Sequence, residues 1–122
     1  ESKGKAIVQT ITIDEMYFDK YIKTGDMIRS FIFPGGMLPS IELFKMEAKK
    51  AGLQVVNHYA FGNSYATILS YWLENFERNL DQIKLLNFDD RFIRVWRFYL
   101  SASIVSFTSN RTNVIQAEIK HA

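Results

Sequence analysis

The sequence contains no cysteine, and only two histidines and two prolines occur in its 122 residues. Without cysteine there can be no disulfide, no thiolate nucleophile and no cysteine-ligated zinc. Two histidines are too few for a histidine-rich metal centre, and the acidic residues form no cluster at ligand spacing. We therefore expect neither a metal site nor thiol chemistry in this chain.

Long hydrophobic runs are also missing, since no stretch reaches the roughly 18 apolar residues of a membrane span. Residues 1–5 are not followed by an apolar block typical of a secretion signal. Lys and Arg number 15 against 13 Asp and Glu, and this net charge of +2 is too small to indicate a nucleic-acid partner. We expect a cytoplasmic protein. It begins with Glu1, which indicates processing or a piece of a longer chain.

The residues that are present make an ordinary globular composition, with 48% hydrophobic, 15% aromatic and 23% charged residues. This balance excludes disordered and fibrous proteins. A chain of this length forms one domain with one modest core. It is too short for a complete two-domain enzyme.

Strands and helices alternate along the chain. β-branched and apolar runs predict strands at 6–13, 53–61 and 114–119. Helical spacing and capping residues predict helices at 14–23, 26–31, 40–51, 65–86 and 90–109. The N-caps expected from this pattern are Asp14, Asp26, Ser40, Ser64 and Asp89 or Asp90. The alternation predicts an α/β fold in which at least some strands pair in parallel.

The first predicted strand, residues 6–13, is a nearly unbroken apolar run. Such a run is typical of a central strand that is buried on both faces. Three strands supply too few neighbours for it, so the sheet looks incomplete. An open edge on this strand would favour self-association by pairing with a second copy or a swapped element.

Two polar side chains stand out near the ends of predicted strands. Gln9 projects with Ile11 from one face of the first strand, and a buried amide must form a hydrogen bond. Its partner is either backbone or water, or a ligand at the carboxyl end of the strand. The Tyr65 ring either heads the apolar stripe of the next helix or presents its hydroxyl where anions bind. Gln9 and Tyr65 are therefore candidates for one crevice.

Other side chains support two interpretations each. Arg91, Arg94, Arg97 and Arg111 either meet lipid phosphates or form a solvated, ion-paired face. A set of aromatic residues forms either core or the wall of an apolar ligand channel: Trp72, Phe76, Trp96, Tyr99 and Phe107. No glycine-rich phosphate loop is present, and the adjacent glycines of the chain lie between prolines. We assign no catalytic role to either histidine.

Four segments in order resemble one family: Val8-Gln9-Thr10-Ile11, the run from Ile32 to Ser40 (IFPGGMLPS), Phe61-Gly62-Asn63-Ser64-Tyr65, and the run from Arg91 to Leu100 (RFIRVWRFYL). They resemble the C-terminal part of the cyclopropane-fatty-acyl-phospholipid synthases, to which the mycolic acid cyclopropane synthases are closely related. The likeness runs over nearly the whole chain with similar spacing. Its most specific part is the proline- and glycine-rich run.

The resemblance implies a class I (Rossmann-like) methyltransferase fold that uses S-adenosylmethionine. Residues 1–122 would hold its fifth to seventh strands with flanking helices, while the cofactor-binding half lies upstream and no cofactor contact falls in this chain. The intact enzyme would add a methylene across the cis double bond of unsaturated phospholipid acyl chains, with transient contact at the inner face of the membrane. This fragment alone would be inactive.

The resemblance also assigns site residues. The family contacts a bicarbonate base through a tyrosine, here Tyr65, and through the backbone of an isoleucine, here Ile11. The family's histidine corresponds to Gln9, which donates hydrogen bonds but cannot carry a proton as imidazole does. Phe33 and Met37 either line the acyl channel or pack the turn. Because of Gln9, a methyl-branched product and another acceptor remain alternatives. Because the cofactor loop is missing, a truncated non-catalytic module that only associates with partners is a further alternative.

Overall fold

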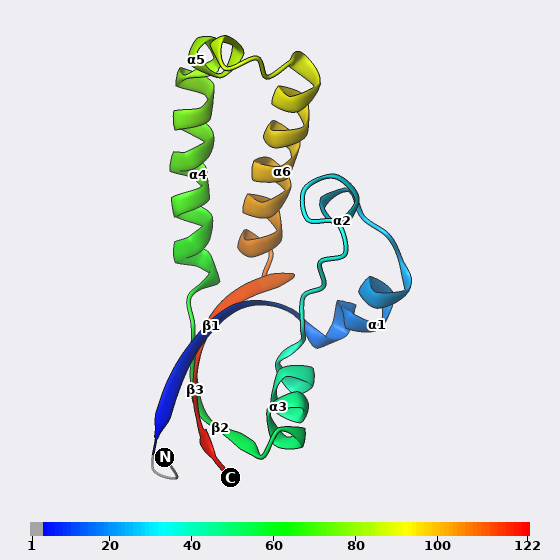
Figure 1. The fold of residues 1–122 in the computed structure, drawn as a ribbon, viewed down its shortest axis with the longest axis vertical. Coiled ribbons are helices and arrows are strands. Elements are labelled where there is room, and N and C mark those ends of the chain that lie inside the picture. The colour runs from blue at the N-terminus through cyan, green and yellow to red at the C-terminus, as the bar shows by residue number, and fades with distance from the viewer. Residues whose placement is uncertain (1–3) are drawn as a thin grey trace.

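The structure is a computed structural model that describes residues 4–122. Its elements follow the predicted order (Figure 1). The strands are β1 (Lys5–Ile13), β2 (Leu53–Ala60) and β3 (Thr112–His121). The helices are α1 (Glu15–Lys23), α2 (Met27–Phe31), α3 (Ile41–Lys50), α4 (Gly62–Arg78), α5 (Leu80–Leu85) and α6 (Asp90–Thr108). The helix predicted at 65–86 is thus two helices, α4 and α5, that meet at Asn79.

The three strands form one sheet in the order β1-β3-β2, and both neighbouring pairs are antiparallel. The predicted parallel pairing is therefore wrong. β1 and β2 do run in the same direction, but β3 lies between them. The chain leaves α6 through a turn at Asn110, whose φ of 57° is left-handed, and enters β3 beside the carboxyl end of β1. β3 therefore begins where β1 and β2 end, so it runs antiparallel to both of them.

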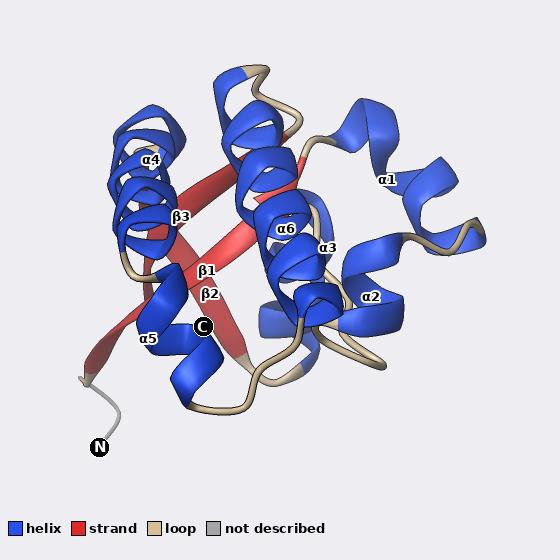
Figure 2. Ribbon diagram, turned by 90° about the horizontal axis from the view of Figure 1, so that it is seen from above, coloured by secondary structure: helices blue, strands red, loops and turns tan. Residues whose placement is uncertain are grey.

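The burial predicted for β1 is also wrong for this chain. Only its last two residues, Thr12 and Ile13, are buried, whereas Ile7 is 65% exposed. β1 stands at one edge of the sheet, and the helices cover its carboxyl end only (Figures 1 and 2). The expected open edge is present. In addition, no described part of the chain covers the apolar side chains at the start of β1.

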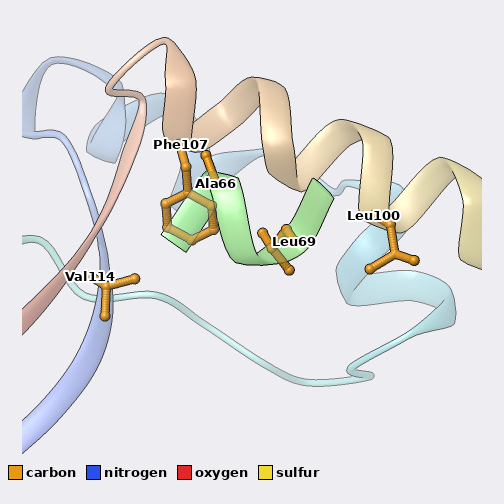
Figure 3. Packing of buried hydrophobic residues seen from close by; sticks show 5 residues of the cluster. All are labelled: Ala66, Leu69, Leu100, Phe107 and Val114. Atoms are coloured by element: carbon orange, nitrogen blue, oxygen red, sulfur yellow. The ribbon is translucent and has the colours of Figure 1, made fainter. Parts of the chain in front are cut away.

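The core lies where the long helices meet the sheet. Ala66 and Leu69 of α4 face Leu100 and Phe107 of α6, and Val114 of β3 closes the cluster (Figure 3). Spacings of three and seven residues place each helical pair on one face of its helix. Burying a Leu or Phe side chain contributes about 1.5–3 kcal/mol to folding. This cluster therefore fixes the α4–α6 hairpin on the end of the sheet.

Four of the predicted helix caps are confirmed, since Asp14, Asp26, Ser40 and Asp89 each accept a backbone N–H of the following turn. The cap predicted at Ser64 is wrong, because α4 begins at Gly62.

The early start of α4 depends on β3. The Gly62 N–H donates to the Asn113 side-chain oxygen at 2.8 Å. A Cβ on Gly62 would stand only 2.6 Å from that oxygen. Glycine therefore lets the N-terminus of α4 come directly against β3 and places the next residues over the end of the sheet.

Candidate functional site

A pocket of about 630 Å³ opens at the carboxyl end of β1. Its walls come from β1, α1, α2, α6, the starts of α4 and β3, and the loop of residues 33–38 that follows α2. The view from above shows α1 and α2 beside α6, on the side away from α4 (Figure 2). The volume lies within the range of about 300–1,000 Å³ that is typical of small-molecule sites.

Two of the predicted site residues, Ile11 and Tyr65, line this pocket together. Ile11 lies near the carboxyl end of β1, and Tyr65 lies in the first turn of α4. The Tyr65 ring packs edge-on against Phe107, with ring centroids 5.1 Å apart, and against Trp72 at 6.4 Å. Tyr65 therefore both heads the apolar stripe of α4 and reaches the pocket, so its two interpretations are compatible.

Gln9 does not line the pocket. Its side chain is exposed, and its Oε1 accepts a hydrogen bond from Nε2 of Gln116 at 3.1 Å. Gln116 lies directly opposite on β3. The predicted burial of Gln9 is wrong because nothing in the described chain covers this part of β1. Side chains two residues apart share a strand face, so Gln9 lies one step outside the pocket beside Ile11.

The loop residues Phe33 and Met37 both line the pocket. Each is about half exposed, 54% and 56%, so neither serves only to pack the turn. The Phe33 ring meets Tyr99 of α6 edge-on at 5.9 Å. Gly35 has a φ of 79° and the Gly36 N–H donates to the Phe33 carbonyl, which closes the turn. This geometry favours the channel interpretation of the two side chains.

The predicted aromatic set is divided by the structure. Tyr99 and Phe107 line the pocket, whereas Trp72, Phe76 and Trp96 do not. Burial raises the pKa of the Tyr99 hydroxyl, and the neighbouring Tyr65 raises it further. Tyr99 therefore stays a neutral phenol at physiological pH and contributes no charge to the pocket.

Sequence reasoning missed two charged residues of the wall and named the third, Arg111, only for lipid phosphates or a solvated face. Asp26 was identified only as a cap, yet it lines the pocket with Arg29 and Arg111. Burial acts to raise the pKa of Asp26, but hydrogen bonds from the Arg29 backbone and side chain outweigh it and hold the pKa below its ordinary value. The Arg111 guanidinium lies 4.9 Å from the centroid of the Tyr17 ring. The only sequence signal was the three-residue spacing of Asp26 and Arg29.

One arginine of α6 forms the ion pair that the solvated interpretation predicts. Arg97 donates to both carboxylate oxygens of Glu77, at 2.5 and 2.7 Å. This hydrogen bond lowers the pKa of Glu77. Arg91 and Arg94 are exposed on the same helix.

The pocket does not fit an adenosyl cofactor by itself. Its wall is mainly apolar, and its one carboxylate, Asp26, is engaged by Arg29. Within residues 4–122 no glycine-rich phosphate loop follows a strand. The same residues contain no group of three or more His, Asp or Glu placed to hold a metal ion. No helix among them is long and apolar enough to cross a membrane.

The fold is that of the class I S-adenosylmethionine-dependent methyltransferases. The cyclopropane synthase MmaA2 from Mycobacterium tuberculosis superimposes with a TM-score of 0.84 at 20% identity, covering 98% of this chain and 45% of that one. The mycolic acid cyclopropane synthase CmaA1, complexed with SAH and CTAB, gives 0.81 at 24% identity, covering 96% and 44%.

The family is shown by the sequence itself. The model of the mycolic acid cyclopropane synthetase family matches residues 1–117, and the chain belongs to that family. The tuberculostearic acid methyltransferase UfaA1 of Mycobacterium tuberculosis is 32% identical over 93% of this chain. A probable fatty acid methyltransferase of Pseudomonas putida is 32% identical over 75%. The chain spans only 27% and 23% of these two relatives.

Proposed function

We propose that this chain is the acyl-binding part of an S-adenosylmethionine-dependent methyltransferase that acts on the double bond of unsaturated phospholipid acyl chains. The observation that carries the proposal is the pocket, whose wall is formed mainly by aliphatic and aromatic side chains. An acyl chain offers no hydrogen bonds, so its recognition depends on apolar contact area. The names of the two relatives, a tuberculostearic acid methyltransferase and a probable fatty acid methyltransferase, support the same substrate class.

The chemistry of such a substrate agrees with an apolar wall. Methyl transfer to an alkene leaves a positive charge on the acyl chain, and water would trap that cation. A pocket that excludes water protects it. Aromatic faces attract cations, and Phe33, Tyr65 and Tyr99 line this pocket. This chain would therefore hold the acyl chain and shield the charged intermediate.

The reaction ends when a proton leaves the alkylated chain, so a base must stand near the pocket. We propose a small oxyanion, bicarbonate, held by the Tyr65 hydroxyl and the Ile11 backbone. Both residues are on the wall. The Gln9 amide, one step along the same strand face, can donate a third hydrogen bond through its NH₂ group because its oxygen is engaged by Gln116. No side chain in this trio accepts a proton readily.

The methyl group comes from S-adenosylmethionine, which supplies an electrophilic sulfonium methyl when bound. The described residues do not form its site, so we propose that the part of the protein outside this chain holds it. By itself the chain would then be inactive. In the cell we propose transient contact with phospholipid at the inner face of the membrane.

A methyl-branched product is the second candidate. Gln9 replaces the histidine that the resemblance implies, and glutamine cannot carry a proton. Loss of a proton from the transferred methyl group closes a ring, whereas loss from a neighbouring carbon leaves a methyl-branched alkene, so a changed group beside the base can change the product. The relative from Mycobacterium tuberculosis, named for tuberculostearic acid, supports this alternative. Loss of the proton gives either a ring or a branched alkene, which are isomers of equal mass, and their different proton NMR signals separate them.

The test uses a protein that contains this chain together with the preceding part of the family's length. It is incubated with S-adenosylmethionine carrying a labelled methyl group and with vesicles of dioleoyl or distearoyl phosphatidylglycerol. We expect label in the oleoyl lipid only, and proton NMR of the acyl chains identifies ring or branched alkene. Absence of label from every lipid would contradict the proposal and favour the non-catalytic module.

A further inference from the structure

We propose that Tyr21 of α1 is a positioning residue, which fixes the loop of residues 33–38 as the outer wall of the pocket and thereby selects the acyl chain. The acyl part of this inference rests on the proposed function. Tyr21 lies in no motif that indicated chemistry, and its role follows from contacts across 17 residues of sequence.

Tyr21 is itself held rigidly. Its side chain is only 8% exposed. The guanidinium carbon of Arg29 lies 4.0 Å from the centroid of its ring, and Nη2 of Arg29 donates to the Tyr21 carbonyl at 2.8 Å. Nε of Arg29 donates in turn to Oδ2 of Asp26 at 2.6 Å. Stacking and a charged hydrogen bond therefore lock the phenol ring between α1 and α2.

From this fixed position the Tyr21 hydroxyl accepts the backbone N–H of Leu38 at 2.9 Å. Leu38 ends the loop of residues 33–38, and Phe33 at its other end packs edge-on against Tyr99 of α6. The loop is thus anchored at both ends, by a hydrogen bond at one and by an aromatic contact at the other. Between these anchors Met37 reaches the pocket.

This arrangement makes the hydroxyl of Tyr21 a determinant of pocket shape. Backbone hydrogen bonds hold the flanks of the loop, from the Phe33 N–H to the Ile28 carbonyl and from the Ile13 N–H to the Pro39 carbonyl. Between these flanks the side chains of Phe33 and Met37 are about half exposed. If the hydrogen bond from Leu38 to Tyr21 is lost, the loop of residues 33–38 becomes more mobile, and this side of the pocket no longer has a single conformation. A wall without a fixed position discriminates poorly between acyl chains of different length or bend.

The test compares Tyr21→Phe with Tyr71→Phe in the full-length protein. Tyr21→Phe removes the hydroxyl and keeps the ring under Arg29. Tyr71 is 60% exposed on α4 and does not line the pocket, so its variant is a matched control. Hydrogen–deuterium exchange gives the first readout. We expect faster exchange at residues 33–38 in Tyr21→Phe, with α4 and α6 unchanged, and no change in the control.

Binding and turnover give the second readout. We expect Tyr21→Phe to bind the fluorescent fatty acid cis-parinarate about fivefold more weakly, as loss of one hydrogen bond implies. In the transfer assay the preference between palmitoleoyl and oleoyl phosphatidylglycerol should shrink, through KM for the lipid and with little change in kcat. Simple loss of stability would lower activity toward both lipids equally.

The outcomes separate the two proposals. Unchanged exchange at residues 33–38 would overturn the role of Tyr21, whether or not the enzyme transfers methyl groups. Faster exchange with unaltered cis-parinarate binding would overturn the link between loop and pocket. If the wild-type protein labels no lipid, the proposed function fails, while exchange and cis-parinarate binding still decide on Tyr21.

Discussion

At the scale of single residues, position relative to the pocket separates the predicted site residues. Ile11, Phe33, Met37 and Tyr65 line one cavity although they are far apart in the sequence. Gln9 shares the strand face of Ile11 but hydrogen-bonds to Gln116 instead. The residue that best tests the site is Tyr65, whose hydroxyl belongs to a mainly apolar wall.

We predict that Tyr65→Phe lowers the rate of methyl transfer about 10²-fold, the usual cost of removing one donor from a charge-stabilising site. The ring contacts with Phe107 and Trp72 remain, so the thermal unfolding midpoint should change little. Initial rates with labelled S-adenosylmethionine and a melting curve measure the two effects. Tyr59→Phe, which alters an exposed residue of β2, is the control. Equal rates for both variants would remove Tyr65 from the site.

Asp26 provides a pH-dependent prediction. Its folded pKa lies below the ordinary value of an aspartate, because hydrogen bonds and charge from Arg29 outweigh burial. Its contribution to stability is therefore fully present above about pH 4, and it is lost as the pH falls through the folded pKa. Asp26→Asn should be less stable than wild type in urea at neutral pH, and the two proteins should converge in strong acid. A difference that persists in strong acid would point to another cause.

At the scale of elements, the junction of β2 with α4 positions the site. The chain passes from the end of β2 into α4 with no room for a side chain at Gly62, since Asn113 of β3 lies against it. This close approach puts Tyr65 over the carboxyl end of β1, where the pocket opens.

We predict that Gly62→Ala destabilises the protein by about 1–3 kcal/mol, because the new methyl group must displace Asn113. Gly25→Ala is the matched control, since a Cβ there meets nothing within 4 Å. Urea unfolding of the two variants measures the difference. If Gly25→Ala costs as much as Gly62→Ala, the close approach to β3 is not what requires glycine.

At the scale of the whole molecule, the sheet is open on the β1 side. β1 pairs with β3 along one edge, and among the described residues its other edge has no partner. Apolar side chains at the start of β1 are exposed, Ile7 among them. Such an edge favours pairing with another strand.

We predict that the 122-residue chain alone self-associates through β1, and that sedimentation will show a mass that rises with concentration. Ile7→Lys should reduce this association, because a charge on an exposed strand opposes pairing. Met16→Lys, which changes a residue 79% exposed on α1, should not. A monomer at all concentrations would exclude self-association through β1.

We also predict that the chain alone does not bind S-adenosylmethionine, whereas a protein with the preceding part of the family's length does. The reason is the apolar pocket, which offers no free carboxylate and no phosphate-type loop in residues 4–122. Calorimetric titration measures binding, and circular dichroism checks that the chain is folded. Tight binding by the folded chain would show that it contains the donor site.

The sequence by itself determined the order of strands and helices, four helix caps, the family and the residues worth testing. These depend on local patterns, namely hydrophobic period, capping chemistry and motif, which are written in neighbouring residues. Both interpretations of Tyr65 also came from its neighbours in the sequence.

Only the tertiary structure decided the strand directions, the exposure of β1, the partner of Gln9 and the role of Tyr21. Burial depends on which elements cover a strand. Ile7 of β1 is exposed in the described structure although the apolar composition of β1 predicted burial. The hydrogen bonds from Gln116 to Gln9 and from Leu38 to Tyr21 join residues 107 and 17 positions apart. No periodicity encodes such pairs, because they arise only when the folded chain brings distant segments together.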